Sequence, residues 1–127
     1  MTDAPRTRIE KLGVKPRQRA CLLAVDDPAL PRELARAGVR QVARVVQGCE
    51  LVFLGVRRAV DLARLATVER RMARAGAVWA VWPKGRSELH GDHVRRAALA
   101  AGLVDVKVIS FSDTHTGLKL VIPLARR

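Results

Sequence analysis

Seven residues lie at or just after the ends of predicted strands, where their side chains could bind a ligand or move a proton. Lys84 follows the apolar segment 77–82, and Asp113 and His115 lie in a turn after a later strand. A lysine, a carboxylate and an imidazole can bind an anion or transfer a proton when they meet. The candidate ligand-binding edge comprises Asp26, Asp27, Trp82, Lys84, Asp113, Thr114 and His115.

The same residues also have a simpler interpretation. Asp113 and the threonines beside it are typical of a turn, and such residues need no binding role. Trp79 and Trp82 fall on opposite faces of their strand, so both are expected in a core. The sequence leaves both interpretations open, and we assign no catalytic residue from it.

Three continuously apolar segments predict the strands that would position these residues. Residues 20–25, 51–56 and 77–82 are typical of strands covered on both faces. Helices are expected over residues 31–37 and 58–75. Because the carboxyl ends of parallel strands meet at one edge of a sheet, the candidate residues should lie near one another.

The remaining segments complete the pattern. Alternating residues in 39–46 indicate a half-exposed edge strand. A helix capped by Asp92 should run to residue 101, followed by a strand over 104–111 and an antiparallel return over 118–124. Alternating strands and helices that end in a hairpin predict an α/β fold. We expect a Rossmann-like three-layer sandwich with a mostly parallel sheet and a C-terminal antiparallel hairpin.

Length and composition place limits on the class of protein. The 127 residues fit one domain, residues 1–127, in which residues 1–16 form a short helix and a lead-in. No apolar run reaches the ~20 residues of a membrane span, and the start lacks a signal-peptide pattern, so we expect a cytoplasmic protein without membrane contact. Cys21 and Cys49 are expected as buried thiols. His90 and His93 lack a third ligand nearby, so no metal site is expected.

The net charge of +12 raises the question of an anionic partner. Weak binding of anions or nucleic acid would suit such a charge, although arginine richness also fits codon preference. With two tryptophans, two phenylalanines and no tyrosine, the chain is poorly suited to stack bases. The candidate surface for anions or nucleic acid comprises Arg64, Arg71, Arg74, Arg95 and Arg96.

The turn after the first strand argues against a nucleotide cofactor. A Rossmann-type site needs glycines there so that the backbone can approach the ligand. No glycine occurs between Gly13 and Gly38, and Asp26 and Asp27 would repel a pyrophosphate. We therefore expect no cofactor from the residues themselves.

The order of elements resembles a shortened class I methyltransferase fold, without the glycine-rich loop that this family uses for S-adenosylmethionine. Residues 11–16, 81–84, 102–108, Thr114 and 116–118 also resemble a family of short bacterial proteins known only as a domain of unknown function (number three-thousand-fifty-two). Members tend to carry tryptophan where this chain has His115. The resemblance implies a Rossmann-like fold and brings no known activity.

Three functional hypotheses follow. The first is a small binding or regulatory module with a degenerate cofactor site and no catalysis. The second is a divergent S-adenosylmethionine-dependent methyltransferase, and the third is a basic nucleic-acid-binding protein. A homodimer is also possible if the strand over 118–124 or over 39–46 is an exposed edge.

Overall fold

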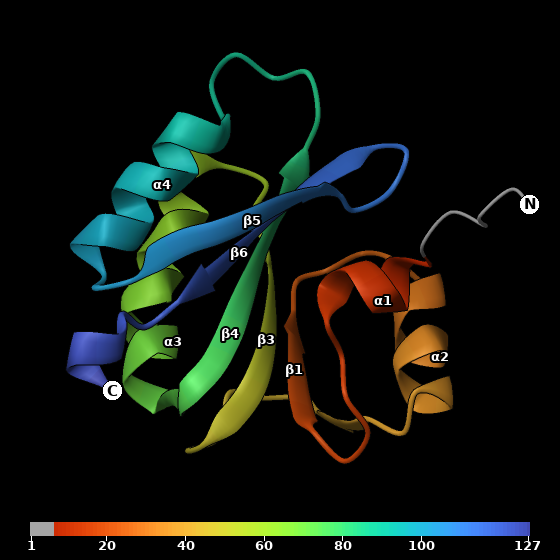
Figure 1. Ribbon diagram of the computed structural model, residues 1–127. Coiled ribbons are helices and arrows are strands. Elements are labelled where there is room, and N and C mark those ends of the chain that lie inside the picture. The colour runs from red at the N-terminus through yellow and green to blue at the C-terminus, as the bar shows by residue number, and fades with distance from the viewer. Residues whose placement is uncertain (1–6) are drawn as a thin grey trace, which may run out of the picture.

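A computed structural model of the protein describes residues 7–127, which form a six-stranded sheet with helices on both faces (Figure 1). In chain order the strands are β1 (Arg19–Leu23), β2 (Arg40–Val42), β3 (Cys49–Gly55), β4 (Met72–Pro83), β5 (Val104–Ser110) and β6 (His115–Val121). Across the sheet their order is β2-β1-β3-β4-β6-β5. The first four strands in that order are parallel, whereas β6 is antiparallel to both β4 and β5. The expected α/β Rossmann-like sandwich with a C-terminal antiparallel hairpin is confirmed.

The helices form the two outer layers. α1 (Arg8–Leu12) and α2 (Ala29–Arg36) cover one face, and α3 (Arg64–Arg71) and α4 (Gly91–Ala100) cover the other (Figure 1). Short 3₁₀ turns occupy Ala59–Ala63 and Leu124–Arg126.

Each face of the sheet has its own apolar core. Because side chains alternate along a strand, neighbours such as Phe53 and Leu54 enter opposite cores. Trp79 packs on the α1/α2 side and Trp82 on the α3/α4 side, and both are buried. The interpretation of both tryptophans as core residues is therefore correct.

The helix expected over residues 58–75 is wrong in its last part. The helix α3 ends at Arg71, and Met72 already has extended backbone, with its side chain buried in the core. The following residues belong to β4, so residues 72–75 are extended and Gly76 is a strand residue. A Cβ at Gly76 would lie 2.6 Å from the carbonyl oxygen of Glu50, so glycine permits the close approach of β4 to β3.

Asp92 does not cap α4 as expected. The helix begins at Gly91, and Asp92 lies exposed within its first turn. The residue before the helix is His90, whose backbone N–H donates to Nδ1 of His93 at 3.2 Å. The two histidines therefore serve the start of the helix.

The edges of the sheet differ partly from expectation. β2 is one edge, as its alternating sequence predicts, but β6 lies between β4 and β5, so β5 is the other edge. A bulge in β5 turns Asp105 and Lys107 to opposite faces: Asp105 pairs with Arg95 of α4, and Lys107 Nζ donates to the carbonyl of Lys11 beside α1. Dimerisation through an edge stays a prediction.

Among residues 7–127, no helix combines the length and the apolar character needed to cross a lipid bilayer.

Candidate functional site

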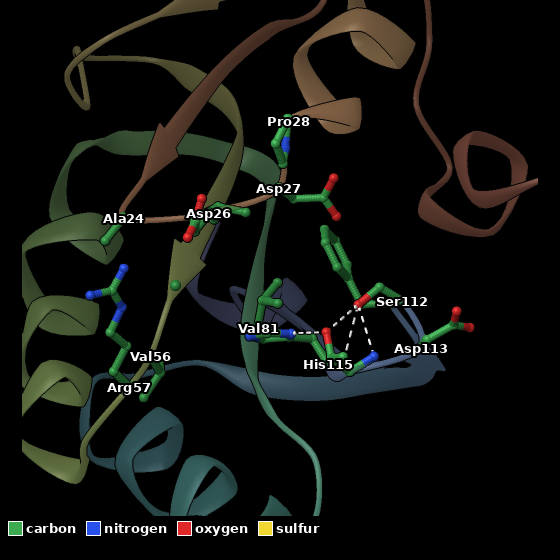
Figure 2. Close-up of a pocket in the computed structure, with 14 residues that line it drawn as sticks. Ala24, Asp26, Asp27, Pro28, Val56, Arg57, Val81, Ser112, Asp113 and His115 are labelled. Carbon is green, nitrogen blue, oxygen red and sulfur yellow. Dashed lines mark hydrogen bonds between the residues drawn. The ribbon is translucent and has the colours of Figure 1, made fainter.

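A cavity of about 340 Å³ opens where β1, β3 and β4 end (Figure 2). It is lined by residues 24–28 after β1, residues 55–57 at the end of β3, and residues 111–115 from the turn after β5 to the first residue of β6. Val81 of β4 completes the wall. Ligands of open α/β sheets bind outside the carboxyl ends of the strands, so the cavity lies where this fold places a site.

The structure brings most of the predicted edge residues to this cavity. Asp26 and Asp27 line it from the β1 side. Asp113, Thr114 and His115 line it from the opposite turn, although they are far away in sequence. The turn arrives at this edge because β5 runs parallel to β4, with β6 between them.

Trp82 and Lys84 are not among the described residues that line the cavity. Trp82 is 5% exposed and belongs to the core under α3 and α4. Lys84 lies outside the cavity, where its Nζ donates to Ser110 Oγ at 2.7 Å and its backbone N–H donates to the carbonyl of Thr114 at 2.9 Å. Lys84 therefore stabilises the turn between β5 and β6 and does not face the cavity.

Asp27 binds the start of α2 and an arginine at the same time. Its Oδ1 accepts the backbone N–H groups of Ala29 and Leu30 at 3.1 and 3.2 Å. Its Oδ2 lies 2.5 Å from Nη1 of Arg8 in α1. An aspartate that precedes a helix satisfies N–H groups that have no partner inside the helix, which is the local reason α2 begins here.

Arg8 connects three segments of the chain beside the cavity, of which those with Asp27 and Phe111 line it. Besides Asp27, its Nη2 lies 2.6 Å from Oε2 of Glu33 in α2, and its Nη1 donates to the carbonyl of Phe111 at 3.3 Å. The guanidinium carbon also lies 4.9 Å from the centre of the Phe111 ring. We call Arg8, Asp27, Glu33 and Phe111 the arginine clamp.

The clamp fixes the charge of both its central partners. The hydrogen bond from Arg8 is the largest influence on Asp27 and lowers the pKa of that carboxyl, although burial opposes it. Burial alone would lower the pKa of Arg8, but the hydrogen bonds to Glu33 and Asp27 outweigh it and the net shift is upward. The negative charge of Asp27 is therefore already compensated inside the protein.

The turn on the far side of the cavity is held by its own hydroxyl groups (Figure 2). Ser112 Oγ accepts the backbone N–H groups of Thr114 and His115 at 3.3 and 3.1 Å. Thr114 Oγ1 lies 2.8 Å from Nδ1 of His115. This contact at Nδ1 orients the imidazole ring of His115, which also lines the cavity.

Close contact between the ends of β1 and β3 shapes the third wall. A Cβ at Gly55 would lie 2.0 Å from the carbonyl oxygen of Ala24, so only glycine fits there. Ala24 itself has φ of +57°, in the left-handed region that favours glycine. The loop after β1 thus keeps a glycine-like bend although no glycine occurs between Gly13 and Gly38.

The arginines predicted as an anion-binding surface are partly engaged with the protein itself. Arg71 donates to a backbone carbonyl, Arg74 pairs with Glu69, and Arg95 pairs with Asp105. The other two have exposed side chains. The full predicted set was Arg64, Arg71, Arg74, Arg95 and Arg96.

Sequence reasoning missed two cationic residues of the site. Arg57 lines the cavity, and its position directly after the apolar segment 51–56 was an available signal. Arg8 had no local signal, because its partners Asp27 and Phe111 lie 19 and 103 residues away.

Within residues 7–127, no group of three or more His, Cys, Asp or Glu side chains could hold a metal ion. Cys21 and Cys49 are buried free thiols, as expected.

Comparisons with known proteins add the fold relationship. No protein-family model and no curated protein matches the sequence, so membership in the family of short bacterial proteins named above stays a prediction. Among solved structures, the chain is similar to a methyltransferase candidate from Thermoplasma acidophilum, with a TM-score of 0.67 and 9% identity over 89% of this chain and 71% of that one. It is also similar to a TehB-like SAM-dependent methyltransferase from Corynebacterium glutamicum, with a TM-score of 0.64 and 11% identity over 91% of this chain and 86% of that one.

A third similar structure is LepI in complex with SAM, with a TM-score of 0.54 and 16% identity over 91% of this chain and 39% of that one. Identities this low show the fold alone. The chain therefore has the Rossmann-like fold of S-adenosylmethionine-dependent methyltransferases, as the order of its elements predicts.

Proposed function

We propose that the cavity binds S-adenosylmethionine and that the protein is a divergent methyltransferase. The observation that carries this proposal is the position of the cavity, at the carboxyl ends of β1, β3 and β4 in a methyltransferase-like sheet. Its volume of about 340 Å³ is in the range of small-molecule sites. The likeness to methyltransferases supports this hypothesis over a module without catalysis.

The backbone beside β1 fits such a ligand. Glycines in this loop let the backbone approach a bound nucleoside closely. Here Ala24 adopts the left-handed conformation, and Gly55 leaves the space beside it without a side chain. The missing glycines therefore do not remove the bend that this type of site uses.

Two carboxylates that line the cavity suit the positive charge of this ligand, while Arg57 is a cation in the same lining. When bound, S-adenosylmethionine supplies a methyl group activated by a positively charged sulfonium. Asp26 and Asp113 line the cavity, and within residues 7–127 neither is in an ion pair. In water, a carboxylate 4 Å from a unit positive charge contributes about 1 kcal/mol.

His115 is positioned to handle the proton that an acceptor loses on methylation. In the tautomer whose Nδ1–H donates to Thr114 Oγ1, at 2.8 Å, the Nε2 atom can accept a proton. We assign His115 the role of general base and Thr114 the role of orienting it.

One observation favours a second candidate, a binding module without methyl transfer. Asp27 already takes the N–H groups of Ala29 and Leu30 at the start of α2. A helix start is otherwise a ready site for an anionic group of a ligand. In this second candidate the cavity binds a ligand, but its residues are not arranged to transfer a methyl group.

Calorimetric titration tests binding, with S-adenosylmethionine and the uncharged-sulfur product S-adenosylhomocysteine as probes. We expect Asp26→Asn to weaken binding of S-adenosylmethionine about fivefold, equivalent to about 1 kcal/mol, and to affect the product less. Asp92→Asn on α4 is the matched control and should leave both affinities unchanged. Absence of heat with both ligands at high micromolar concentration would remove the proposal.

Transfer of a labelled methyl group separates the two candidates. The protein is incubated with methyl-labelled S-adenosylmethionine and with RNA, DNA or protein pools. The methyltransferase is supported if label enters one of these pools and if His115→Gln transfers less label while its affinity for S-adenosylmethionine is unchanged. Binding without transfer to any pool supports the module.

A further inference from the structure

The edge that carries the cavity also carries a group of exposed cations. Arg57 and Arg58 follow β3, and Lys84 and Arg86 follow β4. We call these four residues the basic rim. Because β3 and β4 are parallel neighbours, their following loops emerge side by side. Arg57 also lines the cavity, so the rim adjoins the mouth of the proposed site (Figure 2).

Hydrogen bonds hold the two loops of the rim together. Arg86 Nη1 donates to the carbonyl of Arg57 at 3.3 Å, across the gap between the loops. Asp61 Oδ2 accepts the backbone N–H groups of Arg57 and Arg58 at 2.9 and 3.0 Å, which also lowers the pKa of that carboxyl. The rim is therefore held by one nitrogen of the Arg86 guanidinium and by the backbone of Arg57 and Arg58, while all four rim residues stay exposed.

The side chains of the rim form no ion pairs, although the Asp61 carboxylate lies beside the backbone of Arg57 and Arg58. In the described part of the chain, no rim side chain is within ion-pair distance of a carboxylate. Lys84 Nζ instead contacts the neutral hydroxyl of Ser110. Arg8, Arg74 and Arg95, by contrast, pair with acids. An arginine that is paired with an acid has its charge balanced inside the protein, whereas exposed unpaired arginines attract external anions.

We propose that the basic rim binds the phosphate backbone of a nucleic-acid strand, with one nucleotide at the cavity mouth beside Arg57. This assignment names the substrate class of the proposed methyltransferase and rests on that proposed function. Guanidinium groups match phosphate oxygens in a bidentate geometry, and three of the four rim residues are arginines.

Two features favour a strand over a single small phosphate compound. The rim extends over two loops, and the net charge of +12 attracts polyanions at long range. All four aromatic side chains of the chain are buried, so none offers a stacking platform for bases. Binding should therefore depend on the backbone, tolerate any sequence and fall steeply with salt.

Fluorescence anisotropy with a labelled 20-nucleotide single-stranded RNA measures this salt dependence. Four phosphate contacts on a single strand give a slope of log K against log salt of about −3. The double variant Arg58→Gln/Arg86→Gln should halve that slope and weaken binding at low salt. No binding at 50 mM salt, or an unchanged slope in the variant, overturns the proposal.

A matched control uses the surface predicted from the sequence. Arg64→Gln/Arg96→Gln removes the same charge from exposed positions on α3 and α4. We expect its slope to equal that of the natural protein. If this control lowers the slope as much as the rim variant does, the attraction comes from overall charge and the proposed rim is wrong.

Two further measurements distinguish a failure of the proposed rim from a failure of the proposed function. Adenosine monophosphate should bind far more weakly than the 20-mer, and equal affinity would overturn the strand as the ligand. Calorimetry of the single variant Arg58→Gln, whose side chain does not line the cavity, should give the natural affinity for S-adenosylmethionine. RNA binding without S-adenosylmethionine binding would reject the proposed function while the rim stands, and the reverse result would reject the rim alone.

Discussion

Replacing Gly55 by alanine tests the close approach of β1 and β3 that shapes the cavity. The new Cβ would lie 2.0 Å from the Ala24 carbonyl oxygen, 2.6 Å from its carbonyl carbon and 3.1 Å from the Val25 nitrogen. Because these are backbone atoms, no side chain can turn away to make room. The end of β1 must move by about 1 Å before the contact reaches an acceptable distance.

The expected cost follows from two effects. Overpacking of this kind costs about 1–3 kcal/mol, and each ladder hydrogen bond lost at the end of β1 adds about 1 kcal/mol. We expect Gly55→Ala to lower the free energy of unfolding by about 3 kcal/mol, or the melting temperature by about 12 °C. Urea unfolding followed by circular dichroism measures the first quantity, and a thermal scan the second.

Gly48→Ala is the matched control. Gly48 has φ of +81° and nothing within 4 Å of its added Cβ, so the change costs only the left-handed conformation, about 1 kcal/mol. A cost at Gly55 no larger than the cost at Gly48 would refute the steric argument and with it this wall of the cavity.

Two more outcomes follow from the ionisable groups. Arg8→Met should cost about 2 kcal/mol, since it leaves partly buried carboxylates without their cation, whereas Arg32→Met on the exposed side of α2 should cost almost nothing in the same urea titration. Because the pKa of Asp27 is lowered in the folded state, its ionised form adds to the free energy of unfolding above pH ~4, and this stability is lost as the pH falls further. Arg8→Met should make the free energy of unfolding less dependent on pH in this acid range. Equal pH dependence in the variant and the natural protein would contradict the arginine clamp. Burial raises the pKa of Cys21 to about 11 and also raises that of Cys49, so a thiol reagent at pH 8 should label neither in the folded protein and both after unfolding; rapid labelling of the native state would disprove their burial.

The predictable parts of the fold are those that follow from local patterns. The apolar segments 51–56 and 77–82 were predictable as covered strands, because continuous apolar runs of this short length are typical of strands buried on both faces. The end of α3 was not predictable, because Met72 continues the apolar stripe of a helix yet pairs with Cys49 in the sheet. Only the tertiary contact between β3 and β4 decides that Met72 is extended.

The candidate site was also predictable only in part. The rule that parallel strands end at one edge brought Asp26 and His115 together correctly, since it depends only on strand direction. It failed for Lys84, whose side chain turns behind the hairpin to Ser110. The rule gives positions along the sheet edge but not the direction of a side chain beyond the strand.

The arginine clamp and Gly55 determine which part of the cavity can respond to a ligand. Residues 24–28 are anchored on both sides, by Arg8 through Asp27 and by the tight contact of Ala24 with β3. Residues 112–114, in contrast, are held by hydrogen bonds within their own turn and by one from the backbone of Lys84, and they lie largely exposed. Adaptation to ligands of different size therefore falls to this turn, so one rigid wall sets the position of a ligand and one compliant wall sets the range of sizes it accepts.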